Sequence, residues 1–161
     1  ITDTILRLKV MPGARETLLE LKKNGIRIAV ISGSIDTVLE VLFPDNPFDE
    51  VYINKFVYDE NGLLSSGIAT PFEWEGKADG IKHIAKKENI DMKECVFVGD
   101  NQNDIQVAET AGLSIAFNSR SDTLSQVCNV VIPAENKDVR AVLPYILPGY
   151  ANSKMGNLKN T

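Results

Sequence analysis

The stretch VFVGDNQND, residues 96–104, ends an apolar run in two carboxylates and two carboxamides. A short apolar run of this kind predicts a buried strand of a parallel sheet, and ligands of open α/β sheets bind beyond the carboxyl ends of the strands. Asp100 and Asp104 are two acids four residues apart around a turn, which repel each other unless solvent or a cation separates them. Because hard oxygen ligands suit Mg²⁺, we expect these two residues in a magnesium site. The alternative is that Asp100 or Asn103 only caps the next helix.

Apolar runs that predict strands alternate along the chain with segments of helical periodicity. The predicted strands are 26–31, 95–99, 113–117 and 129–132, and the predicted helices start near 12, 35, 77, 104, 122 and 138. Alternation of this kind predicts βα units and a parallel sheet. The expected fold class is therefore α/β, a Rossmann-like parallel sheet flanked by helices.

The period changes to that of strands between residues 51 and 72. Two strand-like runs flank Glu60-Asn61-Gly62, and Asn-Gly is a strong hairpin signal. We expect a β-hairpin that forms a flap, closed and packed by Phe72 and Trp74.

Ser32-Gly33-Ser34 follows the predicted strand 26–31 and offers a second ligand site. A hydroxyl and backbone N–H groups at the start of a helix make an anion pocket for a phosphate, although the same pattern also fits an ordinary serine N-cap. Lys77 is expected at a helix N-terminus, where a cation opposes the helix macrodipole. This placement has a reason if Lys77 neutralises a phosphate, and otherwise Lys77 is a solvated lysine.

The remaining candidates for chemistry favour structural roles. His83 is the only histidine and lies in the middle of a predicted helix, so we expect it on the surface or in helix packing. Cys95 and Cys128 have neither metal-site spacing nor a disulfide pattern, and both are expected to be buried small residues.

Composition narrows the classes of function. The 161 residues suffice for one compact domain, with 43% hydrophobic and 24% charged residues. A net charge of −5 without a Lys/Arg cluster argues against a nucleic-acid surface. No stretch approaches the roughly 18 apolar residues that span a bilayer. We expect a cytoplasmic protein that binds a small or metal-bound ligand, with no membrane partner; its oligomeric state is left open.

Four segments in this order resemble the haloacid dehalogenase-like hydrolases, and within them the phosphoserine phosphatase-like branch. They are MPGARE (11–16), VISGS (30–34), EGKADGI (75–81) and VGDNQNDIQVAETAGLSIAFN (98–118). The resemblance runs from about residue 8 to residue 147. It implies a Mg²⁺-dependent phosphomonoesterase that works through an aspartyl-phosphate and acts on a small phosphorylated metabolite, phosphoserine first.

The resemblance also implies a role for each matching residue. Ser32 would hydrogen-bond the phosphoryl oxygens with help from the Gly33 amide, and Lys77 would balance charge. Asp100 would ligate Mg²⁺ and Asp104 would support the metal shell. Asn103 would orient the substrate or Ser32.

The family's first motif, an apolar strand ending in DxDx(T/S) that carries the nucleophile, has no match here. Asp3 follows a single apolar residue and has no second Asp two positions on, so we do not assign it. We expect residues 1–148 to form the family's core domain without its nucleophile strand and cap, followed by a polar tail, 149–161. The missing strand would leave the strands near 26–31 and 95–99 with unpaired backbone groups. Such a chain would be the later portion of a longer polypeptide and inactive alone.

Three other classes of function share part of this pattern of residues. A non-catalytic binding or regulatory module would keep the Mg²⁺ and phosphate ligands without the nucleophile, and this alternative stays open. The phosphorylation domain of an ion-pumping ATPase shares a GDxxND element but not the sequence after Asp104. A receiver domain would not place SGS before a hairpin and Lys77.

Overall fold

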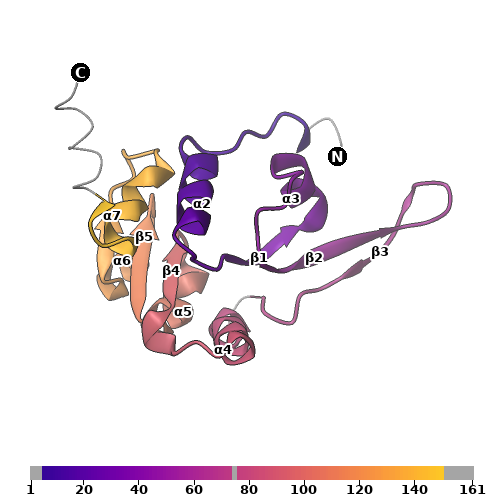
Figure 1. Cartoon of the computed structure of the whole chain (residues 1–161). Coiled ribbons are helices and arrows are strands. Elements are labelled where there is room, and N and C mark those ends of the chain that lie inside the picture. Colours follow the sequence, from indigo (N-terminus) through magenta and orange to yellow (C-terminus); the bar gives the residue numbers. More distant parts are fainter. Residues whose placement is uncertain (1–4, 74–75, 151–161) are drawn as a thin grey trace, which may run out of the picture.

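The computed structural model describes residues 5–73 and 76–150 and shows helices on both sides of two groups of strands (Figure 1). The predicted tail beyond residue 150, Asp3 and Trp74 lie outside the described residues. In chain order the elements are α2 (Ala14–Lys23), β1 (Ala29–Ile35), α3 (Asp36–Leu42), β2 (Glu50–Tyr58), β3 (Leu64–Ile68), α4 (Lys77–Glu88), η2 (Met92–Glu94), β4 (Val96–Gly99), η3 (Gln102–Asp104), α5 (Ile105–Thr110), β5 (Leu113–Phe117), α6 (Asp122–Val127), β6 (Val130–Ile132), η4 (Val139–Val142) and α7 (Leu143–Ile146).

The strands form two separate sheets of three. One has the order β1-β2-β3, with β1 and β2 parallel and β2 and β3 antiparallel. The other has the order β4-β5-β6 and is parallel throughout. The α/β alternation and the parallel pairing are confirmed. Among the described residues no ladder joins β1 to β4, so the sheet is interrupted where the sequence predicts a missing neighbour.

Strand β4 is less buried than its apolar sequence predicts. Val96 is 37% exposed and Val98 is 41% exposed, whereas Ile115 and Ala116 of the neighbouring β5 are fully buried. The physical reason is pairing, because β5 has a strand on each side, whereas within the described residues β4 pairs only with β5. An edge strand leaves apolar side chains and backbone groups open to solvent.

Strand β1 starts and ends later than predicted, and the Asp49 side chain and the pairing with β2 explain the shift. The Asp49 carboxylate accepts the Ile28 amide at 2.8 Å, so this amide is engaged before the strand begins. At the other end Ser32 still pairs with Ile53, and Ile35 pairs with Asn54 after a register shift. The segment Ser32-Gly33-Ser34 therefore belongs to the strand and not to the next helix.

The hairpin of β2 and β3 turns at Asn61-Gly62 as predicted. Gly62 has φ of +75°, a left-handed conformation that glycine adopts without a Cβ clash, and the Asp59 carboxylate accepts the amides of Asn61 and Leu63. All of β3 is exposed, and the hairpin extends away from the rest of the molecule (Figure 1). Whether it acts as a flap stays a prediction.

The apolar core lies mainly around the second sheet. Its clusters join β5 and β6 to η4, join α5 and α6 to β5, and join α2 to α7. The helix predicted for residues 138–147 is divided into η4 and α7. Pro144 lies in the first turn of α7, where its missing N–H is tolerated, and this marks a new helix start.

Candidate active site

The Asp104 side chain stabilises the loop after β4. One oxygen of its carboxylate, Oδ2, accepts the backbone amides of Asp100 and Asn101, both at 3.1 Å. Asn101 caps the η3 turn in return, which completes a capping box. The order Asn-x-x-Asp at residues 101–104 fits a capping box, and this local signal could have identified the role of Asn101 from the sequence.

Lys77 reaches this loop from the first turn of α4. Its Nζ lies 2.6 Å from Asp104 Oδ1, and the two side chains are only 14% and 4% exposed. Both oxygens of Asp104 are thus engaged, one by a cation and one by two amides. A charged pair with so little solvent is rigidly held, because each partner would be costly to leave alone.

Asp100 and Asn103 have polar atoms without protein partners. The Asp100 carboxylate is exposed at the end of β4 and makes no hydrogen bond or ion pair with the described residues. Asn103 Oδ1 is buried and lacks a hydrogen-bond partner among them. Since buried polar atoms are nearly always bonded, the Asn103 oxygen is a position where a ligand group or a water would be accommodated.

A cavity of about 230 Å³ lies beside the open edge of β4. It is lined by Met11, Val98, Gly99, Asp100, Phe117 and Asn118. Asp100 therefore lines a cavity and does not lie on a flat surface. The Ser119 hydroxyl, which donates to the Asp100 carbonyl at 2.8 Å, holds the loop from the other side.

The Ser32-Gly33-Ser34 segment lies at the end of β1, with Gly33 and Ser34 exposed. The Ser32 hydroxyl accepts the Ser34 amide at 3.1 Å. The alternative of an ordinary serine N-cap is wrong, because α3 begins after Ile35 and has no side-chain cap bond. The expectation that these amides start a helix is also wrong, and they belong instead to an irregular strand end.

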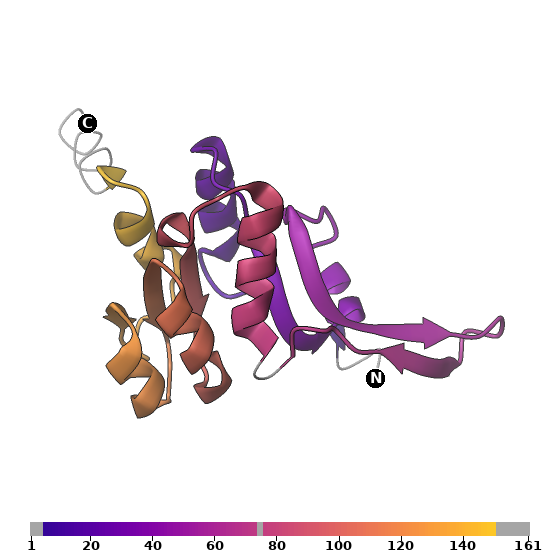
Figure 2. The ribbon, with the colours of Figure 1, turned by 90° about the horizontal axis from the view of Figure 1, so that it is seen from below.

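Helix α4 connects the two parts of the site. It packs against β1 and α5, and Figure 2 shows it between the two groups of strands. A Cβ at Gly80 would lie 2.9 Å from Ile31 Cδ1, so the helix lies close against the residue before Ser32. Lys77 is one turn from this contact. The predicted phosphate and metal residues therefore lie at strand ends on both sides of α4, although no hydrogen bond joins residues 32–34 to residues 100–104 in the described chain.

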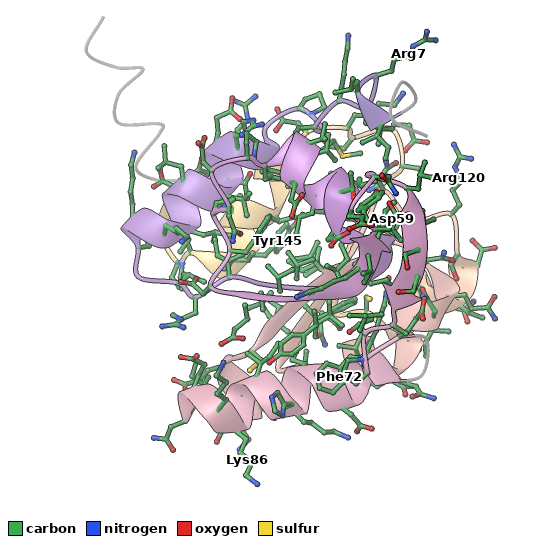
Figure 3. All side chains as sticks on the ribbon, turned by 90° about the vertical axis from the view of Figure 1, so that its right-hand side faces the viewer. Arg7, Asp59, Phe72, Lys86, Arg120 and Tyr145 are labelled. Carbon is green, nitrogen blue, oxygen red and sulfur yellow. The ribbon has the colours of Figure 1, made fainter. Side chains whose placement is uncertain are left out.

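His83 and Phe72 have packing roles, as predicted. Their ring centroids are 5.5 Å apart, and Tyr52 stacks edge-on against both. Figure 3 shows Phe72 lying against α4. These aromatic contacts fix α4 to β2.

The two cysteines are free and only half-buried, so the expectation of full burial is wrong. For Cys95 the reason is its position before the open edge strand β4. Burial raises the pKa of both thiols, which disfavours the reactive thiolate.

No group of three or more His, Cys, Asp and Glu side chains is arranged to hold a metal ion within residues 5–73 and 76–150. In the same residues, none of the helices has the length and apolar character required to cross a bilayer.

Known proteins similar to this chain point to one family. The phosphoserine phosphatase of Methanocaldococcus jannaschii is 31% identical over 146 residues, which cover 91% of this chain and 68% of that protein. The phosphoserine phosphatase of Archaeoglobus fulgidus is 35% identical over 131 residues, which cover 81% of this chain and 38% of that protein.

A solved structure described as a phospho-aspartyl intermediate analogue of phosphoserine phosphatase superposes with a TM-score of 0.78 and 31% identity. The superposition covers 90% of this chain and 68% of that one. A sequence profile of the haloacid dehalogenase-like hydrolases matches residues 2–112. With this match and a 31% identical relative, the chain belongs to the haloacid dehalogenase-like hydrolases.

Proposed function

We propose that this chain is part of a Mg²⁺-dependent phosphatase of the cytoplasm that cleaves a small phosphomonoester. Phosphoserine is the leading substrate, and the reaction proceeds through an aspartyl-phosphate. The observation that carries the proposal is the buried Lys77–Asp104 pair, which fixes a cation at the carboxyl end of β4 while α4 packs on β1 beside Ser32. Phosphoryl transfer depends mainly on positioning and charge neutralisation, which this arrangement supplies. Relatives named phosphoserine phosphatases support the substrate.

The residues at the two strand ends have different roles in binding the phosphoryl group. Ser32 and the exposed Gly33 amide bind phosphoryl oxygens, and Lys77 neutralises their charge. Asn103 offers its side chain, whose Oδ1 has no hydrogen-bond partner among the described residues, to the substrate or to Ser32. Each of these groups is polar, held by the fold and located at the end of a strand or helix.

The acidic residues fit one part of a magnesium site. Asp100 presents a free hard-oxygen carboxylate beside the cavity, as a ligand must. Asp104 has both oxygens engaged, so we propose that it supports the site by orienting the loop and Lys77 and does not bind the ion through a free oxygen. When bound, Mg²⁺ would neutralise phosphoryl charge. With one free carboxylate in place, we expect weak Mg²⁺ affinity for this chain by calorimetry.

We further propose that the nucleophilic Asp lies on a strand that pairs between β1 and β4, in a segment N-terminal to Ile1 of a longer polypeptide. Three observations support this: the interrupted sheet, the exposure of Val96 and Val98, and the extra length of the relatives. An apolar strand in the interruption would satisfy both open edges.

Amide hydrogen exchange tests the added strand. In the 161-residue chain, the β1 and β4 amides that face the interruption should exchange fast, and in the longer polypeptide they should be protected. The amides of β5 serve as the control, since they are paired in both. Equal exchange at β1 and β4 in the two proteins would contradict the added strand.

Phosphate release from phosphoserine and p-nitrophenyl phosphate tests the activity. The longer polypeptide should release phosphate only with Mg²⁺, and Asp100→Asn should lower the rate at least about a hundredfold if the ion is lost. Asp79→Asn, on the exposed face of α4, is the matched control and should be active. A longer polypeptide without activity toward either ester would favour the non-catalytic module.

A further inference from the structure

Two residues of the Ser32-Gly33-Ser34 segment have no partner on the neighbouring strand. In the parallel pairing of β1 with β2, Ser32 is opposite Ile53 and Ile35 is opposite Asn54. Gly33 and Ser34 therefore form a bulge, and their backbone groups need another source of hydrogen bonds. Residues that lie beside a bulge commonly decide where it points.

The Asn54 side chain supplies a hydrogen bond to the Gly33 carbonyl, and each of its polar atoms has a partner. Its Nδ2 donates to the Gly33 carbonyl at 2.9 Å and to Glu73 Oε1 at 3.1 Å. Its Oδ1 accepts the Thr70 amide at 2.7 Å. A carboxamide has two N–H donors and one carbonyl oxygen, and here each has a partner.

Asn54 thereby links the bulge to the segment that leads into α4. Thr70 and Glu73 follow the hairpin and precede α4, whose first residue is Lys77. Glu73 also packs on Gly33 directly, because a Cβ at Gly33 would lie 2.9 Å from Glu73 Oε1. A residue with a Cβ at position 33 would force the Glu73 side chain to shift.

The Glu73 side chain forms no salt bridge within the described residues. It accepts one hydrogen bond there, from Asn54, and it is part-buried next to an exposed backbone segment. Its Oε1 lies against Gly33, so the carboxylate would repel an anion bound at Gly33 and Ser34 unless its charge is held in place. The Asn54 amide keeps Oε1 occupied and so fixes where the negative charge lies.

We propose that Asn54 is a positioning residue. It holds the Ser32-Gly33-Ser34 bulge and the Lys77 end of α4 at a fixed spacing, so that both contact the same phosphoryl group. The proposal rests on the phosphatase function proposed above. Asn54 need not touch the substrate. Its effect is carried by the Gly33 carbonyl on one side and by Thr70 and Glu73 on the other.

The substitution Asn54→Asp tests the proposal with almost no change of shape. Aspartate still accepts the Thr70 amide but loses both donated bonds and faces the Gly33 carbonyl and the Glu73 carboxylate with a negative charge. In the longer, active polypeptide kcat for phosphoserine should fall at least about tenfold, because small misplacements of catalytic groups cost that much. KM should change less than about twofold, since the bond-breaking geometry is affected more than ground-state binding.

A second substitution provides a rescue. In Asn54→Asp combined with Glu73→Gln, the glutamine amide can donate to Asp at 54 and the like-charge repulsion is gone, so kcat should recover at least about threefold. Asn61→Asp is the matched control, the same change on an exposed turn of the same hairpin, and it should leave kcat unchanged. Unchanged kcat in Asn54→Asp, or no recovery in the double variant, would overturn the proposal.

Backbone amide NMR of the 161-residue chain separates the two proposals. Asn54→Asp should shift the amide resonances of Gly33, Ser34 and Lys77 together, while Asn61→Asp should shift none of them. If the longer polypeptide is inactive but these shifts occur, the phosphatase function fails and the positioning role of Asn54 stands. If the shifts are confined to residues 53–55, Asn54 does not couple the two segments, whatever the activity.

Discussion

The two sheets of this molecule are stabilised in different ways. The sheet β4-β5-β6 is packed by apolar clusters in which Ile115 and Leu124 are fully buried. In the strands of β1-β2-β3, Ile53 is the buried hydrophobic residue found in the described chain, and β3 is exposed throughout. The β1-β2-β3 sheet is organised by polar side chains instead.

These polar side chains satisfy backbone amides that the β1-β2-β3 sheet leaves open. Asp49 accepts the Ile28 amide, Asp36 accepts the Phe56 amide at 3.2 Å, and Asn54 accepts the Thr70 amide. Such bonds specify geometry but contribute only about 1 kcal/mol each, whereas a buried leucine contributes several times as much. The β4-β5-β6 half of the molecule therefore provides most of the apolar stabilisation, while polar side chains determine the geometry of the β1-β2-β3 half.

The largest expected effect separates the two halves by stability. Leu124→Ala, at a fully buried position, should lower the free energy of unfolding by about 4 kcal/mol, because it removes contacts and leaves a cavity. Leu64→Ala, on the exposed β3, should change it by less than about 0.5 kcal/mol. Urea unfolding measures both, and similar losses would show that the halves are equally packed.

The ion pair between α4 and the β4 loop should give the next largest effect. Lys77→Met leaves Asp104 buried without its cation and should cost about 3 kcal/mol of unfolding free energy. The control Lys82→Met removes an exposed pair with Asp79 and should cost less than about 0.5 kcal/mol. If Lys77→Met proves as stable as the control, the Lys77–Asp104 ion pair does not contribute to the free energy of unfolding.

Two glycine substitutions should act in opposite directions. At Gly112 a Cβ would lie 2.1 Å from the Lys93 carbonyl oxygen, so Gly112→Ala should cost about 2 kcal/mol by forcing the backbone apart. At Gly67 on β3 the nearest atom would be 3.6 Å away, and Gly67→Ala should stabilise by about 0.5 kcal/mol through lower unfolded-state entropy. Thermal unfolding checks both signs; a loss of stability at Gly67 would mean that β3 is packed more closely than the structure shows.

The smallest effect concerns the acid response of the β2–α4 contact. The hydrogen bond from Lys87 holds the pKa of Glu50 below its ordinary value of 4.5. A carboxyl with a lowered folded-state pKa adds stability above its unfolded-state pKa, and this stability is lost as the pH falls through the folded-state value. Glu50→Gln should therefore flatten the stability curve slightly below about pH 4.5, as measured by urea unfolding at several pH values. Glu60→Gln, in the exposed turn, should leave the curve unchanged.

Much of the fold could be predicted from local patterns. The hairpin at Asn61-Gly62 and the start of α4 at Lys77 depend on conformational preferences of a few neighbouring residues. The site segments 32–34 and 100–104 were recognisable for the same reason, since each is a polar break after an apolar run. The interruption of the sheet was also expected, from the missing motif.

Other features depend on residues far apart in the chain. Asn54 and Glu73 act on Gly33, from 21 and 40 positions away, and no local pattern marks them. The engagement of both Asp104 oxygens depends on Lys77 arriving from another helix. The exposure of Val96 and Val98 depends on which strands pair with β4.

By itself, the order of residues determined the α/β alternation, the hairpin and the polar segments that a phosphatase needs, because each follows from the periodicity or turn chemistry of adjacent residues. The packing of distant segments makes VFVGDNQND end in a loop closed by Asp104 and Lys77, and it leaves the Asp100 carboxylate without a partner among the described residues. The physical reason is that hydrogen bonds and ion pairs between distant residues form only once the strands and α4 have packed together, so they determine which carboxylate is free to meet a ligand.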